Sequence, residues 1–143
     1  MASFFENELS ERGFLVYRTA GASMKPLLKQ GRDLVTVRPV TRPLKKYDVP
    51  LYRSKRDGRQ VYILHRIVKV LPDGYVIRGD NTYFDERGVT DADIVGVMTA
   101  FKRKGKDVSV ESRAYKAYVR IWCFVYPLRK LVRPVYSKLR KAL

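Results

Sequence analysis

The chain has little of the chemistry that would cross-link it or hold a metal ion. Its 143 residues include one cysteine, Cys123, and one histidine, His65. A single thiol cannot form an intrachain disulfide, and one Cys with one His falls short of a structural zinc site. We therefore expect no metal and no other cofactor. With 45% apolar residues, the chain can instead build a hydrophobic core.

Long apolar segments are also missing. No uncharged run reaches the roughly 18 residues that a transmembrane helix needs. Residues 1–12 contain Glu6, Glu8 and Glu11, whereas a signal peptide has a basic start and an apolar stretch. We therefore expect neither a signal peptide nor a transmembrane helix, and a protein that is cytoplasmic or peripheral to a membrane.

Acidic residues are scarce, and the imbalance is concentrated near the C-terminus. Thirty Lys and Arg against fourteen Asp and Glu give a formal charge of +16. Residues 102–143 hold thirteen basic and two acidic residues, or +11 of that total. A concentrated positive field favours a polyanionic partner surface, either phospholipid headgroups or nucleic acid.

Most of the chain has the alternation and turn signals of a mainly β domain, which we expect over residues 1–106. A short helix is expected before the first strand, over residues 3–11, with Ser3 as its cap and Gly13 after its end. The expected strands span residues 14–18, 33–39, 48–53, 75–78 and 94–102. Residues 61–70 form a β-rich run, and residues 79–93 are expected to form a loop.

From Arg113 the period changes to that of a helix, within a tail expected over residues 107–143. Beyond Pro127 the apolar residues occupy about a third of the helical circumference, and most basic residues lie elsewhere. The pattern predicts a basic amphipathic helix that is kinked or broken at Pro134. The apolar set is Leu128, Leu131, Val132, Val135, Leu139 and Leu143.

Four roles for this tail remain open. The helix could pack on the β domain, lie in the interface of an anionic membrane, dock on a partner protein, or bind nucleic acid. The apolar stripe, with Trp122 upstream, favours the membrane interface over nucleic acid. Nucleic-acid binding needs charge but no long apolar face. Packing on the β domain is not separated from the membrane role by the sequence.

Three short segments carry a nucleophile, a base and a carboxylate. Ser23 lies in Gly-Ala-Ser-Met-Lys-Pro, His65 in Leu-His-Arg-Ile-Val, and Asp80 in Arg-Gly-Asp-Asn. A hydroxyl attacks poorly at neutral pH unless a base takes its proton, and imidazole is well suited to do so. Each residue alone has an ordinary structural interpretation, as a turn serine, a core histidine or a turn acid. Their combination is what indicates catalysis.

In order and spacing, these segments resemble the signal peptidase I family, whose members are serine peptidases with a mostly β catalytic domain. Residues 22–26 are similar to its nucleophile box, residues 64–68 to its base box, and residues 78–81 with Asp85 to its third box. The similarity covers about residues 14–101. His65 resembles the histidine-type branch of the endoplasmic reticulum, archaea and some sporulating bacteria, because the commoner enzymes have lysine there.

The resemblance implies a serine endopeptidase that hydrolyses a leader or signal peptide with small side chains before the cut. His65 would accept the proton of Ser23 and return it to the leaving amine. The backbone N–H of Ser23 would bind the oxyanion. For the acid that orients the imidazole, Asp80 is the first choice and Asp85 the second, and Glu86 falls where the family has an acid. Any of these three acids could be the third member.

The surroundings of the boxes differ from the family pattern. The family has a transmembrane helix before the nucleophile box, and its Gly-Asp after that box is Gly31-Arg32-Asp33 here. Arg66, beside the base, could pair with Asp80 or Asp85, or form a surface ion pair. The alternative function is a catalytically inactive module of this fold that binds peptide, an anionic membrane or nucleic acid. Retention of both the serine and the histidine favours the enzyme.

Overall fold

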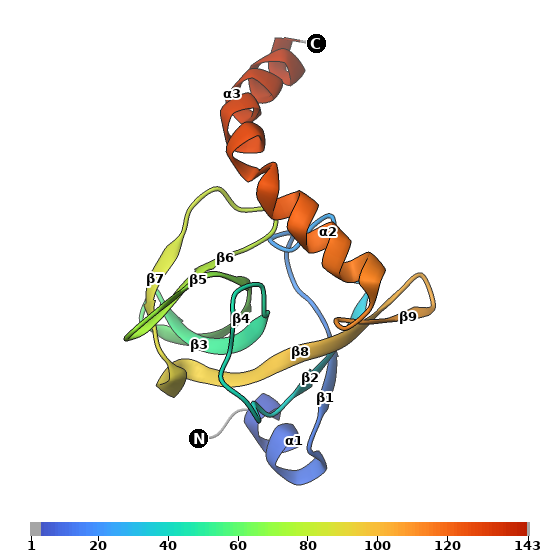
Figure 1. Ribbon diagram of the computed structural model, residues 1–143, viewed down its shortest axis with the longest axis vertical. Helices are drawn as coiled ribbons and strands as arrows, with labels where there is room; N and C mark the ends of the chain where they lie inside the picture. Colours follow the sequence, from blue (N-terminus) through green and yellow to red (C-terminus); the bar gives the residue numbers. More distant parts are fainter. Residues whose placement is uncertain (1–3, 143) are drawn as a thin grey trace. The chain divides into compact units, whose positions relative to one another are not determined.

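The computed structural model describes residues 4–142, which divide into two compact units after Val110. The first unit is mainly β, as expected, with a curled antiparallel sheet and a short N-terminal helix (Figure 1). The expected boundary after residue 106 falls inside this unit, because Lys106–Ser109 forms a strand that pairs with the preceding one. Ser3 and Leu143, expected as a helix cap and as part of the apolar stripe, lie outside the described residues.

The larger sheet has six strands, and β1 and β4 stand at the two ends of its main path. The strand order is β1-β2-β8-β3-β4, with β9 pairing β8, and all pairs are antiparallel. The strands are β1 (Leu15–Arg18), β2 (Leu34–Arg38), β3 (Pro50–Arg56), β4 (Arg59–Leu64), β8 (Ile94–Arg103) and β9 (Lys106–Ser109). Along this path, β1 and β4 each pair with one neighbouring strand, so each leaves one edge unpaired within the sheet.

The smaller sheet contains β5 (Arg66–Leu71), β6 (Gly74–Arg78) and β7 (Glu86–Val89). The β-rich run expected over residues 61–70 is divided at His65, because β4 ends at Leu64 and β5 begins at Arg66 in the other sheet. The expected loop over residues 79–93 is wrong in part, since it contains β7 and the 3-10 helix η1 (Asp91–Asp93). Both differences come from long-range strand pairing, which a local run of apolar or polar residues does not reveal.

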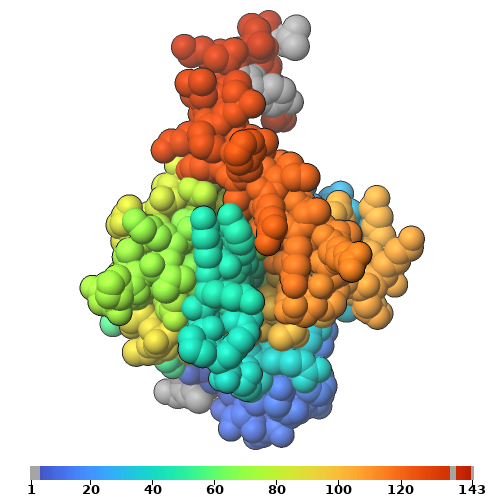
Figure 2. All heavy atoms as spheres, viewed as in Figure 1, coloured from blue at the N-terminus to red at the C-terminus, as the bar shows by residue number. Residues whose placement is uncertain are grey.

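A hairpin turn lengthens β3 and β4 beyond the expected strands. Asp57 and Gly58 have φ angles of 52° and 75°, so both residues of the two-residue loop are left-handed. This geometry suits the twist of a tight hairpin and favours an Asp-Gly pair. Pairing therefore continues to Arg56 and Arg59. The turquoise spheres in Figure 2 show this hairpin on the surface of the first unit.

A buried cluster joins the two sheets. Tyr52 from β3 and Ile67 from β5 are both fully buried and belong to the same cluster. Because they come from different sheets, their burial holds the two sheets against each other. The cluster consists of Leu44, Tyr52, Ile67, Tyr75, Ile77 and Val89. His65, the residue between β4 and β5, thus occupies the junction of the two sheets.

The helices agree with the expected periodicity, apart from the position of one break. The N-terminal helix α1 spans Phe4–Arg12 and is followed by Gly13 at a φ of 76°, a conformation that ends a helix. The second unit contains α2 (Arg113–Phe124) and α3 (Tyr126–Ala142). The chain remains helical through Pro134, and the break comes at Val125 instead. Within residues 4–142, no helix is both long and apolar enough to cross a bilayer.

Candidate active site

The turn that carries Ser23 is held by the third box. The backbone N–H of Asn81 donates to the Ser23 carbonyl at 2.8 Å, and the Asn81 side-chain amide donates to the Ala22 carbonyl at 3.0 Å. The backbone N–H of Asp80 points at the sulfur of Met24, 3.4 Å away. Met24 is buried, and it anchors the turn from behind while Ser23 stays half-buried. Two segments nearly sixty residues apart are therefore joined by contacts that each involve the main chain.

Gly79 is the point where all three boxes meet. A Cβ atom placed on Gly79 would lie 2.7 Å from the Ser23 carbonyl oxygen and 3.1 Å from Cδ2 of His65. The first of these distances is shorter than real Cβ contacts, and the backbone oxygen it meets has little freedom to move. The absence of a side chain at this position thus lets the serine turn and the histidine ring approach the same stretch of backbone.

His65 is 7% exposed, and its ring packs edge-on against Tyr52, with 6.5 Å between ring centroids. Burial lowers the pKa of His65 below its ordinary value, because the charged imidazolium is poorly solvated there. The carboxylate of Glu86 opposes this pKa shift, the guanidinium of Arg56 adds to it, and Asp80 opposes it more weakly. The imidazole is therefore neutral near pH 7, which is the form that can accept a proton.

Ser23 and His65 are close to one another but are not hydrogen-bonded. Within residues 4–142, neither the Ser23 hydroxyl nor the His65 ring has a hydrogen-bond partner. The backbone N–H of Ser23 is likewise not used by an acceptor from that part of the chain. Catalytic hydrogen bonds often close only when substrate is bound. The unused donor at the serine is the group that an oxyanion requires.

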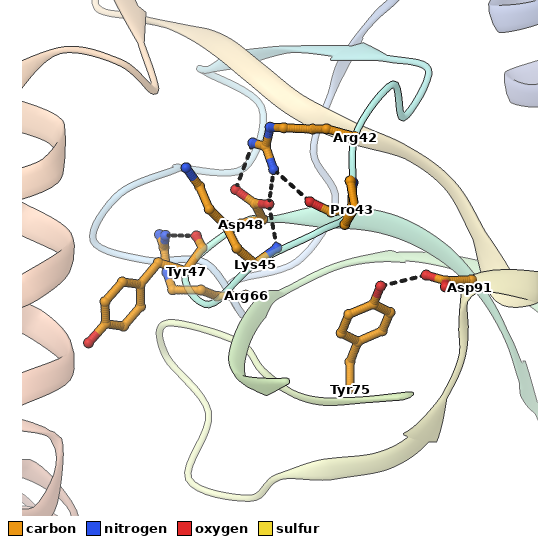
Figure 3. A network of polar contacts seen from close by, with 8 residues as sticks. All are labelled: Arg42, Pro43, Lys45, Tyr47, Asp48, Arg66, Tyr75 and Asp91. Atoms are coloured by element: carbon orange, nitrogen blue, oxygen red, sulfur yellow. Dashed lines mark hydrogen bonds and ion pairs between the residues drawn. The ribbon is translucent and has the colours of Figure 1, made fainter. Parts of the chain in front are cut away.

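Asp80 is held by Arg66 in a buried ion pair. The guanidinium donates from Nε to one carboxylate oxygen at 2.8 Å and from Nη2 to the other at 2.9 Å. The exposed fractions of the two side chains are 1% and 2%. Arg66 also donates to the backbone carbonyl of Tyr47 at 3.0 Å (Figure 3). Of the pairings open to Arg66, the structure has the one with Asp80, and the carboxylate is thereby directed at the arginine.

The other two acids occupy different positions relative to the histidine. Asp85 lies 3.2 Å from Arg78 in a partly exposed ion pair. Glu86 accepts a hydrogen bond of 2.5 Å from the hydroxyl of Tyr52, the same residue whose ring contacts His65. Glu86 is also the acid whose charge raises the pKa of His65 most. The structure thus brings Glu86, rather than Asp85, into electrostatic contact with His65.

Sequence reasoning did not single out Tyr52 or Arg56 as parts of this site. Tyr52 is an aromatic residue in a strand, and such residues are ordinary core residues. Arg56 lies beside a polar turn, where a cation is expected on any soluble protein. Neither position has a local signal, because each reaches His65 or Glu86 only through the pairing of β3 with β4 and the contact between sheets.

A cavity of about 530 Å³ lies along the serine and histidine. Its walls come from α1, from β1 and the following turn, and from β4. Aromatic rings of Phe5, Tyr17 and Tyr62 line it together with Ser23 and His65. The two catalytic candidates therefore share the wall of a largely apolar cavity of the size that binds small ligands or a few peptide side chains.

Comparison of the chain with protein-family models, with curated proteins and with solved structures finds no match. Within residues 4–142, no group of three or more His, Cys, Asp and Glu side chains is arranged to hold a metal ion. The groups that the site itself supplies are a hydroxyl, a neutral imidazole and two carboxylates that act on that imidazole.

Proposed function

We propose that this chain is a serine endopeptidase of the histidine-type signal peptidase I kind, which hydrolyses a leader or signal peptide. The observation that carries the proposal is the meeting of Ser23 and His65 at Gly79, on the wall of the cavity. A serine and a histidine from segments forty-two residues apart have no structural need to adjoin the same glycine. Their convergence is the arrangement that general-base activation of a hydroxyl requires.

The mechanism follows from the protonation states. His65 is neutral near pH 7 and accepts the Ser23 proton as the oxygen attacks the peptide carbonyl. The backbone N–H of Ser23 donates to the oxyanion. The imidazolium then passes its proton to the leaving amine, and water, activated by the same imidazole, hydrolyses the acyl-enzyme. A rotation of the serine or histidine side chain, on substrate binding, brings Oγ and the ring nitrogen into hydrogen-bond contact.

We assign the acids different roles from those expected. Glu86 stabilises the imidazolium through its charge and is fixed by the Tyr52 hydroxyl. Asp80 is a positioning residue, because its ion pair with Arg66 fixes the turn that carries Gly79 and Asn81. Asp85 has no part in the proposed mechanism, since its carboxylate pairs with Arg78.

The substrate is an extended peptide that lies along the cavity. The cavity is lined by residues of β1 and β4, the terminal strands of the main sheet path, and an extended segment can add to such a strand through main-chain hydrogen bonds. Ala20 and Gly21 line the cavity next to the serine and leave room for the peptide backbone. By resemblance, the residues before the cut have small side chains.

The proposal is tested by incubating the full chain with a library of leader peptides and identifying new termini by mass spectrometry. Wild-type protein and the matched control Ser10→Ala, a substitution at an exposed helix position, are expected to cleave the same sites. Ser23→Ala is expected to lower kcat by about 10⁴-fold or more, because the nucleophile is absent. Identical cleavage by wild type and Ser23→Ala would exclude Ser23 as the nucleophile.

A second candidate is a module of this shape that binds peptides without cleaving them. It is favoured by the missing hydrogen bond between Ser23 and His65 and by the engagement of Asp80 with Arg66. Peptides that bind wild type and Ser23→Ala with equal affinity, and that remain intact after long incubation with either, would establish this function in place of the enzyme.

A further inference from the structure

The helices of the second unit carry an exposed apolar stripe. Seven large apolar side chains of α2 and α3 are each at least 47% exposed, with Phe124 reaching 85%. Most of them are spaced three or four residues apart, and at about 100° per residue all seven fall on one side of a helix. Together we call them the tail stripe: Ile121, Phe124, Leu128, Leu131, Val132, Val135 and Leu139.

The tail stripe continues across the break between the two helices. The Val125 N–H donates to the Ile121 carbonyl at 3.0 Å, and the Arg129 N–H donates to the Val125 carbonyl at 2.9 Å. Both are helical bonds that bridge Val125. The Arg129 guanidinium adds a second link, since it lies 3.7 Å from the centre of the Trp122 ring and donates to the Trp122 carbonyl at 2.9 Å. The helical phase is thus carried from α2 into α3.

The charge of these helices has one sign. Residues 113–142 contain nine Lys and Arg and no Asp or Glu. In α3 most of the cations fall on the side of the helix away from the tail stripe, with Lys138 near its edge. Figure 2 shows the placed residues of α2 and α3 as orange to red spheres. The occupant of the tail stripe must therefore offer apolar contact and negative charge along the same length of helix.

We propose that α2 and α3 lie in the interface of an anionic lipid bilayer, with the tail stripe among the acyl chains and the cations toward the headgroups. Neither helix is apolar and long enough to cross the bilayer, which leaves an orientation in its plane. A second copy of the chain is disfavoured as the occupant, because it would bring nine cations against nine. Nucleic acid would leave the apolar side chains in water.

The test is sedimentation of the full chain with vesicles, and it does not depend on the proposed catalysis. The vesicles contain either phosphatidylcholine alone or equal parts of phosphatidylcholine and phosphatidylglycerol. We expect binding to the anionic vesicles at low salt, and a marked loss of binding with zwitterionic vesicles or at about 0.5 M salt. The Ser23→Ala chain is expected to bind equally well.

Charge-neutral variants separate the apolar contribution from the electrostatic one. Leu128→Gln/Leu131→Gln is expected to lower the partition coefficient at least about tenfold, because two buried leucines are lost from the lipid. Glutamine is a good helix former, so circular dichroism should be unchanged. The matched control Val40→Gln/Val70→Gln alters two exposed valines of the first unit and is expected to change partitioning less than about twofold.

Four outcomes would overturn the proposal. They are absence of vesicle binding at low salt, equal binding to both vesicle types, equal binding by the double-leucine variant, and tighter binding to single-stranded RNA that does not require the tail stripe. Dimerisation of wild type that is abolished by Leu128→Gln/Leu131→Gln, without any vesicle binding, would identify a second copy as the occupant instead.

Discussion

Arg66 and Asp80 face each other through two hydrogen bonds of 2.8 and 2.9 Å, and both side chains are almost completely buried. Each is the immediate neighbour of a residue at the proposed site, since Arg66 follows His65 and Asp80 follows Gly79. The pair therefore fixes the start of β5 against the turn that follows β6. It thereby holds His65 in place relative to the serine turn, without contact between the pair and the proposed reacting atoms.

Replacement of Asp80 by asparagine is expected to destabilise the fold. The substitution keeps the shape but removes the charge that compensates the buried guanidinium, and breaking a buried pair costs about 3–5 kcal/mol. The free energy of unfolding, measured by urea denaturation, is expected to fall by that amount. Asp85→Asn is the matched control, because its partly exposed pair with Arg78 is worth about 1 kcal/mol or less. Equal losses in the two variants would show that the buried pair contributes no more to the free energy of unfolding than the partly exposed pair does.

Gly79→Ala is expected to reduce both stability and activity. The new methyl group meets the Ser23 carbonyl at 2.7 Å, so the serine turn must move. Such overpacking costs about 1–3 kcal/mol. Gly74→Ala has a similar clash, 2.5 Å from the Val89 carbonyl, but Gly74 is the first residue of β6 and contacts neither Ser23 nor His65. Both variants should lose stability, measured by thermal unfolding, whereas only Gly79→Ala should lose kcat at a temperature where both are folded. Unchanged kcat in Gly79→Ala would contradict the proposed geometry.

The pKa of His65 can be followed directly, because it is the single histidine of the chain. Nuclear magnetic resonance titration of its ring is expected to give a pKa below about 6.5, the ordinary value. Glu86→Gln removes a charge that raises the pKa of His65, so the titration should move to lower pH. Arg56→Gln should move it to higher pH.

Asp85→Asn is the control for these shifts, since Asp85 pairs with Arg78 and is expected to leave the His65 titration nearly unchanged. If the pKa of His65 shifted more in Asp85→Asn than in Glu86→Gln, then Asp85 rather than Glu86 would be the acid that stabilises the imidazolium. If the proposed mechanism holds, the acidic limb of kcat/KM against pH should follow the same direction in each variant, because the neutral ring is the base.

Stability is expected to fall as the pH falls below about 6.5. The pKa of His65 is lowered in the folded state, so the unfolded chain takes up a proton first. The contribution to stability is complete above the unfolded pKa and is lost as the pH drops toward the folded pKa. The slope is at most about 1.4 kcal/mol per pH unit. In His65→Gln, urea midpoints between pH values of about 7 and 5.5 should vary less than in wild type. Equal slopes in the two proteins would exclude His65 as their source.

Local patterns predicted much of the fold because they reflect local physics. The alternation of residues 33–39 predicted β2, and the helical spacing after Arg113 predicted α2 and α3. The division at His65 could not be predicted in this way. Residues 61–70 are rich in β-formers throughout, and only the pairing of β4 with β3 and of β5 with β6 assigns the two halves to different sheets. The first unit continues to Val110, beyond the expected boundary after residue 106, because β9 pairs with β8. This pairing too was not visible in the local pattern.

By itself the sequence determined which reactive groups exist. It holds one imidazole, a serine in a turn that begins with glycine, several acids near the third box, and a tail of one charge sign. The tertiary structure alone decided how these groups act on one another. It paired Asp80 with Arg66. It also placed Tyr52 against His65, with Glu86 bonded to the Tyr52 hydroxyl. Finally, it brought Ser23 and His65 next to Gly79, which has no side chain. Hydrogen bonds and charge interactions depend on distance in space, and distances between remote segments are set by strand pairing and core packing rather than by spacing along the chain.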